Sequence, residues 1–251
     1  MTNSISIIIG GSSGMGLATA QQLASQGKTV VLVGRDTAKL DAARAQISGQ
    51  VETLQGDVAD TAGVEALIAK IDAEDRHIAE LVNAAGSFLP KAFLDHEVAD
   101  FDTYHNVNRG LFFVTQAVAR NMKAHGGGSI VNVGSMWAKQ AIKATPSSAY
   151  SMAKAGLHAM TQHLAMELAD HNIRVNAVSP AVVVTPIFAS FIPADDVEKT
   201  LVDGFGAFHP IGRVGRPEDI AQNICFLLSD AAGWTTGVVN DVDGGVMAGR
   251  N

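Results

Sequence analysis

The stretch ISIIIGGSSGMG, residues 5–16, joins a short apolar run to a glycine-rich turn, and a helical pattern follows at once. An apolar run without alternation is typical of a strand that is buried on both faces of a parallel sheet. Gly10, Gly14 and Gly16 permit a tight turn and let the backbone approach a pyrophosphate at the N-terminus of the helix. The stretch therefore predicts the first strand, turn and helix of a dinucleotide-binding sheet.

Outward from this stretch, apolar runs and helical segments alternate along the chain. We expect strands at Ile5–Ile9, Thr29–Val33, Val51–Gln55, Ile78–Asn83, Ser129–Gly134, Ile173–Val178 and Val238–Val242. The expected helices include Gly14–Gln26, Ala99–Lys123, Ser148–Asp170 and Pro217–Ser229. Such alternation implies right-handed crossovers between parallel strands. The predicted fold is α/β, a doubly wound (Rossmann) parallel sheet of about seven strands with helices on both faces, and residues 1–251 form one domain.

One segment interrupts this alternation. Residues 186–210 contain no clear strand and carry four phenylalanines, Phe188, Phe191, Phe205 and Phe208. The segment could be helices that pack their rings into the core, or a mobile apolar lid over a substrate. It follows the C-terminal end of the sixth expected strand, and open α/β sheets bind ligands at that edge. We therefore expect a substrate lid at about 186–210.

Composition excludes several classes of function. The formal net charge of −7 argues against a nucleic-acid partner, and no apolar run is long enough to span a membrane. The single cysteine, Cys225, cannot form an intrachain disulfide, which fits a reducing compartment such as the cytoplasm. His158 and His163 are five apart on an expected helix and so point to different faces, and no other histidines show ligand spacing. We expect no metal site.

The glycine turn has a second interpretation. Gly11 and Gly16 are five apart, as in the phosphate-binding loop of nucleoside triphosphatases. That loop requires a lysine and then a serine or threonine, whereas Leu17 and Ala18 follow here. The dinucleotide interpretation therefore stands.

The residues after the second expected strand are the ones that contact the cofactor's adenosine ribose in dinucleotide-binding folds. NAD enzymes usually place an acidic side chain here, but the chain reads Val33-Gly34-Arg35-Asp36. Gly34 has no carboxylate, and the Arg35 guanidinium suits a 2′-phosphate. The alternative is that Arg35 is a solvated charge and that Asp36 caps the next helix. We expect NADP(H) to be preferred, with NAD(H) possible.

Motifs spread over the whole chain, taken together, resemble the short-chain dehydrogenase/reductase family. They are the three glycines of the turn, Asp57, Asn83-Ala84-Ala85-Gly86, Ser135, Tyr150-x3-Lys154, Asn176 and the closing DVDGG at 241–245. Tyr150 and Lys154 are four apart on an expected helix and so share a face. A nearby ammonium group favours the phenolate of a tyrosine, and so does an oxidised nicotinamide.

The resemblance implies a role for each motif. Tyr150 would be the general acid and base, Lys154 would tune it and hold the nicotinamide ribose, and Ser135 would hydrogen-bond the substrate oxygen. Asp57 would bond the adenine, and Asn83 would stabilise the fourth strand. The cofactor-binding residues implied in this way are Gly10, Ser12, Ser13, Gly14, Met15, Gly16, Arg35, Asp57, Val58, Asn83, Ala84, Ala85, Gly86, Tyr150, Lys154, Pro180, Val183 and Thr185.

The fourth catalytic residue of the family is an asparagine in the helix before the fifth strand. The usual spacing lands on Val107, between Asn106 and Asn108. A one-residue shift such as a π-bulge could present Asn108, which we expect to be catalytic in preference to Asn106.

The expected activity is the NADP(H)-dependent reduction of an apolar ketone, aldehyde or keto ester, because Phe88, Leu89, Trp137 and Ile142 accompany the lid phenylalanines. A dehydrogenase that oxidises an alcohol or steroid with NAD is the nearest alternative, because the same residues serve both directions. A non-catalytic dinucleotide-binding regulator is a remote one. The resemblance also implies a homo-oligomer, commonly a tetramer built on the helices at Ala99–Lys123 and Ser148–Asp170.

Overall fold

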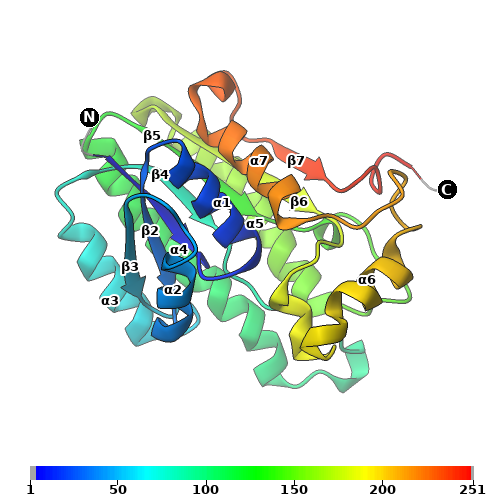
Figure 1. Ribbon diagram of the computed structural model, residues 1–251. Coiled ribbons are helices and arrows are strands. Elements are labelled where there is room, and N and C mark those ends of the chain that lie inside the picture. The colour runs from blue at the N-terminus through cyan, green and yellow to red at the C-terminus, as the bar shows by residue number, and fades with distance from the viewer. Residues whose placement is uncertain (1–3, 250–251) are drawn as a thin grey trace.

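A computed structural model describes residues 4–249, which form a seven-stranded sheet in which every neighbouring pair of strands is parallel (Figure 1). The strands are β1 (Ser4–Ile9), β2 (Thr29–Gly34), β3 (Val51–Gln55), β4 (His77–Asn83), β5 (Gly128–Val133), β6 (Ile173–Pro180) and β7 (Val239–Val242). Their order across the sheet is β3-β2-β1-β4-β5-β6-β7, so the strand order reverses between β1 and β4. The predicted fold class is confirmed, and each expected strand is present within two residues at either end.

Helices cover both faces of the sheet. One face carries α1 (Gly14–Ser25), α2 (Thr37–Arg44) and α7 (Pro217–Leu228), and the other carries α3 (Thr61–Asp72), α4 (Val98–Ala124) and α5 (Ser148–Glu167). Two clusters of buried aliphatic side chains fill the layers, one on each face. The strands are apolar on both faces for this reason, and burial of that apolar area is the main favourable term in folding.

Two helices that the sequence pattern left unassigned, α2 and α3, begin at aspartate caps. The Asp36 carboxylate accepts a hydrogen bond from the Lys39 backbone N–H at 3.1 Å, and Asp60 accepts one from the Gly63 N–H at 2.8 Å. Such caps satisfy backbone donors that a helix leaves unpaired. Asp36 therefore caps α2, as the alternative to a contact between Arg35 and a 2′-phosphate proposed for it; the role of Arg35 stays a prediction.

The segment at 186–210 lies beyond the sheet as short 3₁₀ turns at Pro186–Ser190 and Ala194–Asp196, followed by α6 (Val197–Phe205) (Figure 1). It contains no strand. Phe188, Phe205 and Phe208 are partly buried in a cluster that also holds Trp137 and Tyr150. Three of the four rings thus pack as the first interpretation expected, beside Tyr150, whereas Phe191 is 41% exposed. Movement of the segment as a lid stays a prediction.

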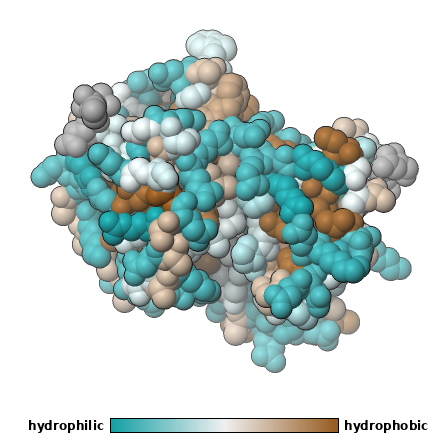
Figure 2. Space-filling view, viewed as in Figure 1, coloured by the Kyte–Doolittle hydropathy of each residue, from teal (hydrophilic) through white to brown (hydrophobic). Residues whose placement is uncertain are grey.

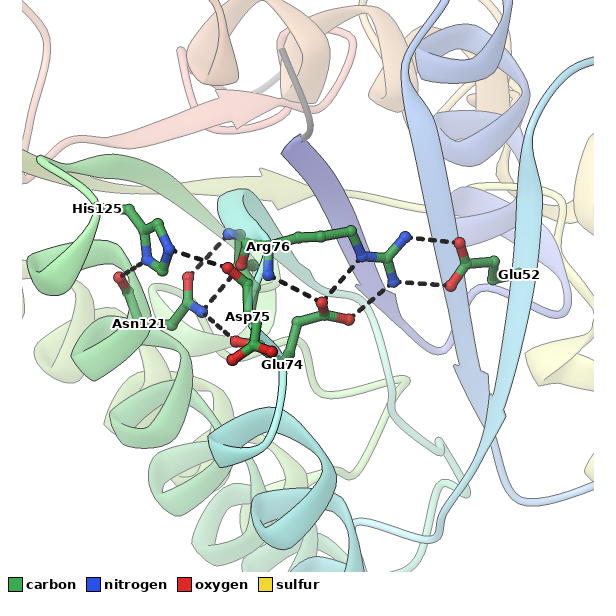
Figure 3. Close-up of polar contacts among 7 residues, drawn as sticks. Glu52, Glu74, Asp75, Arg76, Asn121 and His125 are labelled. Carbon is green, nitrogen blue, oxygen red and sulfur yellow. Dashed lines mark hydrogen bonds and ion pairs between the residues drawn. The ribbon is translucent and has the colours of Figure 1, made fainter.

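An ion-pair network ties β3 to the turn before β4 (Figure 3), near the N-terminal ends of both strands. The Arg76 guanidinium donates to both carboxylate oxygens of Glu52, at 2.7 and 2.9 Å, and to Glu74 at 2.8 and 2.9 Å. Asn121 of α4 donates to the backbone carbonyls of Glu74 and Arg76. Bidentate pairing is the strong form of a charge-assisted bond, so this network fixes an end of the sheet that holds no predicted site residue.

The surface shown in Figure 2 is mostly hydrophilic, with hydrophobic residues in small, separated groups. Within residues 4–249, no helix combines the length and the apolar character that a membrane crossing requires. In the same range, no group of three or more His, Cys, Asp or Glu side chains is placed to hold a metal ion.

Candidate active site

The turn between β1 and α1 is closed against the neighbouring backbone. Gly10 has φ +83°, and a Cβ on it would lie 2.7 Å from the Ala85 nitrogen. A Cβ on Gly16 would lie 2.3 Å from the Gly10 carbonyl oxygen. The Gly10 N–H donates to the Val33 carbonyl at 2.8 Å, which fixes the turn to β2. Only glycine fits either position, and the backbone is left bare where a pyrophosphate would approach the N-terminus of α1.

A cleft of about 1070 Å³ passes over this turn, along the edge where the parallel strands end. It is lined by most of the residues predicted to bind the cofactor, which are Gly10, Ser12, Ser13, Gly14, Met15, Gly16, Arg35, Asp57, Val58, Ala84, Ala85, Gly86 and Thr185. Ligands of doubly wound sheets bind where the strand order reverses, and the turn after β1 lies at that point. The size, position and bare backbone of the cleft fit a dinucleotide.

Two cations stand at the β2 end of this cleft. Arg35 and Lys39 both line it, and Gly34, the last residue of β2, has no side chain to fill the space beside them. A Cβ on Gly34 would lie 3.5 Å from the Ser12 hydroxyl oxygen and 3.3 Å from Leu40. Asp36 lines the cleft too, but its carboxylate caps α2. The sequence pattern did not point to Lys39, which lies in the first turn of α2.

Asn83 lies in the core, outside the cleft. Its side-chain nitrogen donates to Thr115 of α4 at 2.9 Å and to Asn132 of β5 at 2.8 Å. Asn132 in turn donates to Thr161 of α5 at 2.8 Å. Buried polar groups are retained when they are paired in this way. The chain of bonds holds α4 and α5 to the central strands directly beneath the site.

Tyr150, Ser135 and Lys154 come together at the C-terminal end of β5. Tyr150 and Ser135 line a small pocket of about 60 Å³ that shares Met15, Phe88 and Thr185 with the large cleft. The Lys154 ammonium donates to the Val133 carbonyl at 2.7 Å and lies 5.9 Å from the centre of the Tyr150 ring. It also stands 3.7 Å from where a Cβ on Gly86 would be, beside the cleft. Pro180 and Val183 line the small pocket.

Burial dominates the ionisation of this group. It raises the pKa of Tyr150 to about 12, against the opposing effect of a hydrogen bond with the Ser135 side chain. It lowers the pKa of Lys154 to about 8. Lys154 was expected to tune Tyr150 by favouring its phenolate. In the protein by itself the pKa of Tyr150 moves up because burial dominates, and the Lys154 ammonium donates to the Val133 carbonyl. Tuning of Tyr150 by Lys154 stays a prediction.

Aromatic rings cover Tyr150. Phe88 meets it edge-on, with ring centres 4.9 Å apart, and also contacts Trp137, Phe188 and Phe191 at 6.0 to 6.3 Å. Such edge-to-face pairs are favourable beyond the area that they bury. Leu89 lines the large cleft and Ile142 packs beside Trp137, so the apolar residues named from the sequence do gather around the site.

Asn108 lies away from both cavities. Its side-chain nitrogen donates to the Ala153 carbonyl of α5 at 2.6 Å, and α4 is an unbroken α-helix at this point. The one-residue shift that would present Asn108 to the reacting groups is therefore absent. Asn106 and Val107 line the large cleft instead. Asn108 fixes the residue before Lys154, which is a positioning contact.

Two further residues at the site had no sequence signal. The Tyr104 hydroxyl of α4 bonds both backbone groups of Leu89, and its ring centre lies 5.7 Å from that of Tyr150. The buried His158 of α5 accepts a hydrogen bond from the backbone N–H of Ser135 at 3.4 Å. His158 was considered as a metal ligand and set aside, and no pattern pointed to this contact.

In comparison with known proteins, residues 10–247 match a family model described as enoyl-(acyl carrier protein) reductase. The chain is 39% identical over 250 residues to a cis-4-hydroxycyclohexanecarboxylate dehydrogenase of Sinomonas cyclohexanicum, covering 97% of this chain and 96% of that protein. It is 35% identical over 248 residues to the 3-oxoacyl-(acyl-carrier-protein) reductase FabG of Thermotoga maritima, covering 97% of each.

Among solved structures, levodione reductase superposes with a TM-score of 0.89 at 31% identity, covering 99% of both chains. These matches extend over essentially the whole chain. The chain therefore belongs to the short-chain dehydrogenase/reductase family and is an oxidoreductase that acts on an alcohol or ketone with a nicotinamide cofactor.

Proposed function

We propose that this enzyme reduces the carbonyl group of an apolar ketone, aldehyde or keto ester and prefers NADPH. The observation that carries the proposal is the position of Tyr150 and Ser135 in a small, largely apolar pocket that opens onto the glycine-lined cleft. A carbonyl placed in the pocket would have both hydroxyl groups within reach of its oxygen, with the cofactor's nicotinamide beside it. NADPH, when bound in the cleft, would supply a hydride for the carbonyl carbon.

The protein's own residues would handle the oxygen and its proton. Ser135 donates a hydrogen bond where negative charge develops on the oxygen, and Tyr150 transfers its phenolic proton to that oxygen. Lys154, held by the Val133 carbonyl, contributes positive charge beside the phenolate that remains and would hold the cofactor's ribose. The covering rings of Phe88, Phe188 and Trp137 exclude water, so these interactions act in a medium of low dielectric constant.

The reducing direction needs a protonated Tyr150. Burial raises the pKa of Tyr150 to about 12, so the phenol keeps its proton at neutral pH, and the same burial makes it a weaker acid. In the oxidising direction the same group must first lose that proton, which the positive charge of an oxidised nicotinamide would favour. The alternative is an NAD-dependent alcohol or steroid-type dehydrogenase, and a dehydrogenase is among the relatives.

The preference for NADPH rests on Arg35 and Lys39. Both line the β2 end of the cleft, where the adenosine ribose of a dinucleotide lies in this fold. A guanidinium and an ammonium group can each bond a 2′-phosphate, and a charge-assisted bond contributes roughly 1.5–3 kcal/mol. Arg35→Ser is therefore expected to weaken NADPH binding about 10- to 100-fold and to leave NADH binding nearly unchanged.

Fluorescence titration with NADPH and with NADH measures this preference without a substrate. Arg44→Ser removes the same charge from the far end of α2, outside the cleft, and is the matched control. Lys39→Ser should act in the same direction as Arg35→Ser. A wild-type protein that binds NADH more tightly, or an Arg35→Ser variant that loses both cofactors equally, would favour the NAD-dependent alternative.

We also propose that the enzyme is a cytoplasmic homotetramer. Exposed apolar residues on α4 and α5 support the assembly: Phe112 and Phe113 are 46% and 42% exposed, and Met152 and Met166 are 57% and 82% exposed. Apolar side chains exposed on neighbouring helices are typical of an interface between subunits. Light scattering at micromolar concentration is expected to give about four times the chain mass. A mass equal to one chain would contradict the assembly.

The proposed cytoplasmic location is supported by the one cysteine, Cys225, which is buried and so suits a reducing compartment.

A further inference from the structure

The helix that carries Tyr150 and Lys154 carries a third polar residue in the same row. Tyr150, Lys154 and His158 follow one another at intervals of four and so lie along one face of α5. Each of them contacts the C-terminal end of β5. Tyr150 pairs with the Ser135 side chain, Lys154 donates to the Val133 carbonyl at 2.7 Å, and His158 accepts from the Ser135 N–H at 3.4 Å.

The imidazole of His158 is seated against the residue before Ser135. A Cβ on Gly134 would stand 2.0 Å from the His158 Nε2 atom, so the ring occupies the space that any other residue at 134 would need. His158 is 8% exposed and Ser135 is 5% exposed. The backbone N–H of Ser135 leaves the strand ladder at this point, and a buried donor without a partner is costly. The imidazole is the partner that the fold supplies.

The acceptor role requires a neutral imidazole, with its proton on Nδ1. Burial lowers the pKa of His158 to about 4, and the positive charges of Lys139 and Lys154 act in the same direction. Asp241, which pairs with Lys139 at 2.7 Å, acts in the opposite direction. The ring is therefore neutral near pH 7, and its Nε2 lone pair is available to Ser135.

We propose that His158 is a positioning residue for catalysis, which holds the Ser135 backbone so that the Ser135 hydroxyl points at Tyr150 and at the substrate oxygen. The Ser135 hydroxyl oxygen also accepts from the Trp137 N–H at 3.3 Å, so the backbone at 135 and the turn that follows it are fixed together. This inference rests on the proposed function. It adds that the His158 imidazole orients the Ser135 side chain through the Ser135 backbone, without touching the substrate.

The first test is made on the protein by itself. Hydrogen exchange of the Ser135 amide is measured in wild type, His158→Leu and His158→Gln, with His163→Leu, an exposed site on the same helix, as the control. Leucine is similar in size but accepts no hydrogen bond, whereas the Gln amide oxygen reaches nearly as far as Nε2. We expect exchange at Ser135 to rise about tenfold in His158→Leu and to be restored by His158→Gln.

The second test uses turnover of a carbonyl substrate with NADPH. His158→Leu is expected to lower kcat about tenfold and to leave the dissociation constant of NADPH within about twofold of wild type. The hydrogen bond from Ser135 lowers the pKa of Tyr150, whereas burial and Tyr104 of α4 raise it. Lys154, the neighbouring cation, lies on α5 together with Tyr150. A misplaced Ser135 therefore raises that pKa, and the alkaline limb of the pH profile moves to higher pH.

A purely structural role for His158 would lower thermal stability and leave the pH profile in place. Unchanged exchange at Ser135 in His158→Leu overturns the proposal, and so does a loss of kcat that His158→Gln shares in full. If wild type reduces no carbonyl substrate, the proposed function fails, and the exchange experiment alone then decides whether His158 holds Ser135.

Discussion

Tyr150→Phe is expected to lower kcat/KM for carbonyl reduction by about 100- to 10,000-fold, the usual contribution of a positioned general acid. The substitution removes one oxygen atom and the proton that it would donate. The ring would still pack against Phe88 and Tyr104, at 4.9 and 5.7 Å between ring centres. The fold and the cofactor cleft should therefore be preserved, and the dissociation constant of NADPH should change by less than about twofold.

Tyr104 provides the matched control, because the chain contains two tyrosines and their rings are in contact. Tyr104→Phe removes a hydroxyl that bonds the backbone of Leu89. Both residues line the large cleft, outside the small pocket that holds Ser135 and Tyr150. Its loss of kcat/KM is expected to be less than about tenfold. Initial rates of NADPH consumption measure both variants. A Tyr150→Phe enzyme that keeps more than about a tenth of the wild-type rate would show that another group supplies the proton.

Gly10→Ala is expected to weaken NADPH binding by about 100-fold or more. The new Cβ would stand 2.7 to 2.8 Å from backbone atoms of Ala84 and Ala85, which line the cleft. Backbone atoms cannot rotate away as a flexible side chain can. Either the glycine turn or the end of β4 must shift, and the bare surface offered to a pyrophosphate is lost. The dissociation constant from fluorescence titration measures this effect.

Gly27→Ala separates that clash from backbone strain. Gly27 has φ +82°, against +83° at Gly10, so alanine meets the same conformational penalty of roughly 1–2 kcal/mol at either position. A Cβ on Gly27 has no atom within 4 Å. Gly27→Ala should therefore lose only the stability that the positive φ costs, Gly10→Ala should lose more because of the added clash, and only Gly10→Ala should lose the cofactor. Equal NADPH affinity in the two variants would show that the turn does not bind the pyrophosphate.

Several features of the fold follow from local patterns. Ile5–Ile9 and Thr29–Val33 are apolar on both faces because helices cover both sides of the sheet. A short apolar run of this kind therefore predicts a buried parallel strand. The glycine turn is equally explicit, because Gly10 and Gly16 have no space for a side chain. Sequence alone therefore predicts the cofactor edge of the sheet.

The catalytic face was only partly predictable. The spacing of Tyr150 and Lys154 places them on one side of a helix, but the pKa of each depends on what covers it. Phe88 and Phe188 come from two distant loops that no local pattern joins. The direction of Asn108 was also not predictable from the sequence. Asn106, Val107 and Asn108 differ in direction by a fraction of a helical turn. Packing of α4 against Ala153 of α5 decides which of them faces the cleft.

The central claim is that hydride passes directly between a nicotinamide cofactor and a substrate carbon beside Tyr150. NADPH carrying deuterium at one or the other face of its nicotinamide C4 tests it, with mass spectrometry of the alcohol formed from a panel of apolar ketones and keto esters. The account predicts deuterium on the alcohol carbon from one of the two labelled cofactors only, at a rate that Tyr150→Phe lowers about 100- to 10,000-fold. The account would be contradicted by an alcohol that carries deuterium from neither labelled cofactor. It would also be contradicted if Tyr150→Phe transferred deuterium to the alcohol as fast as the wild type.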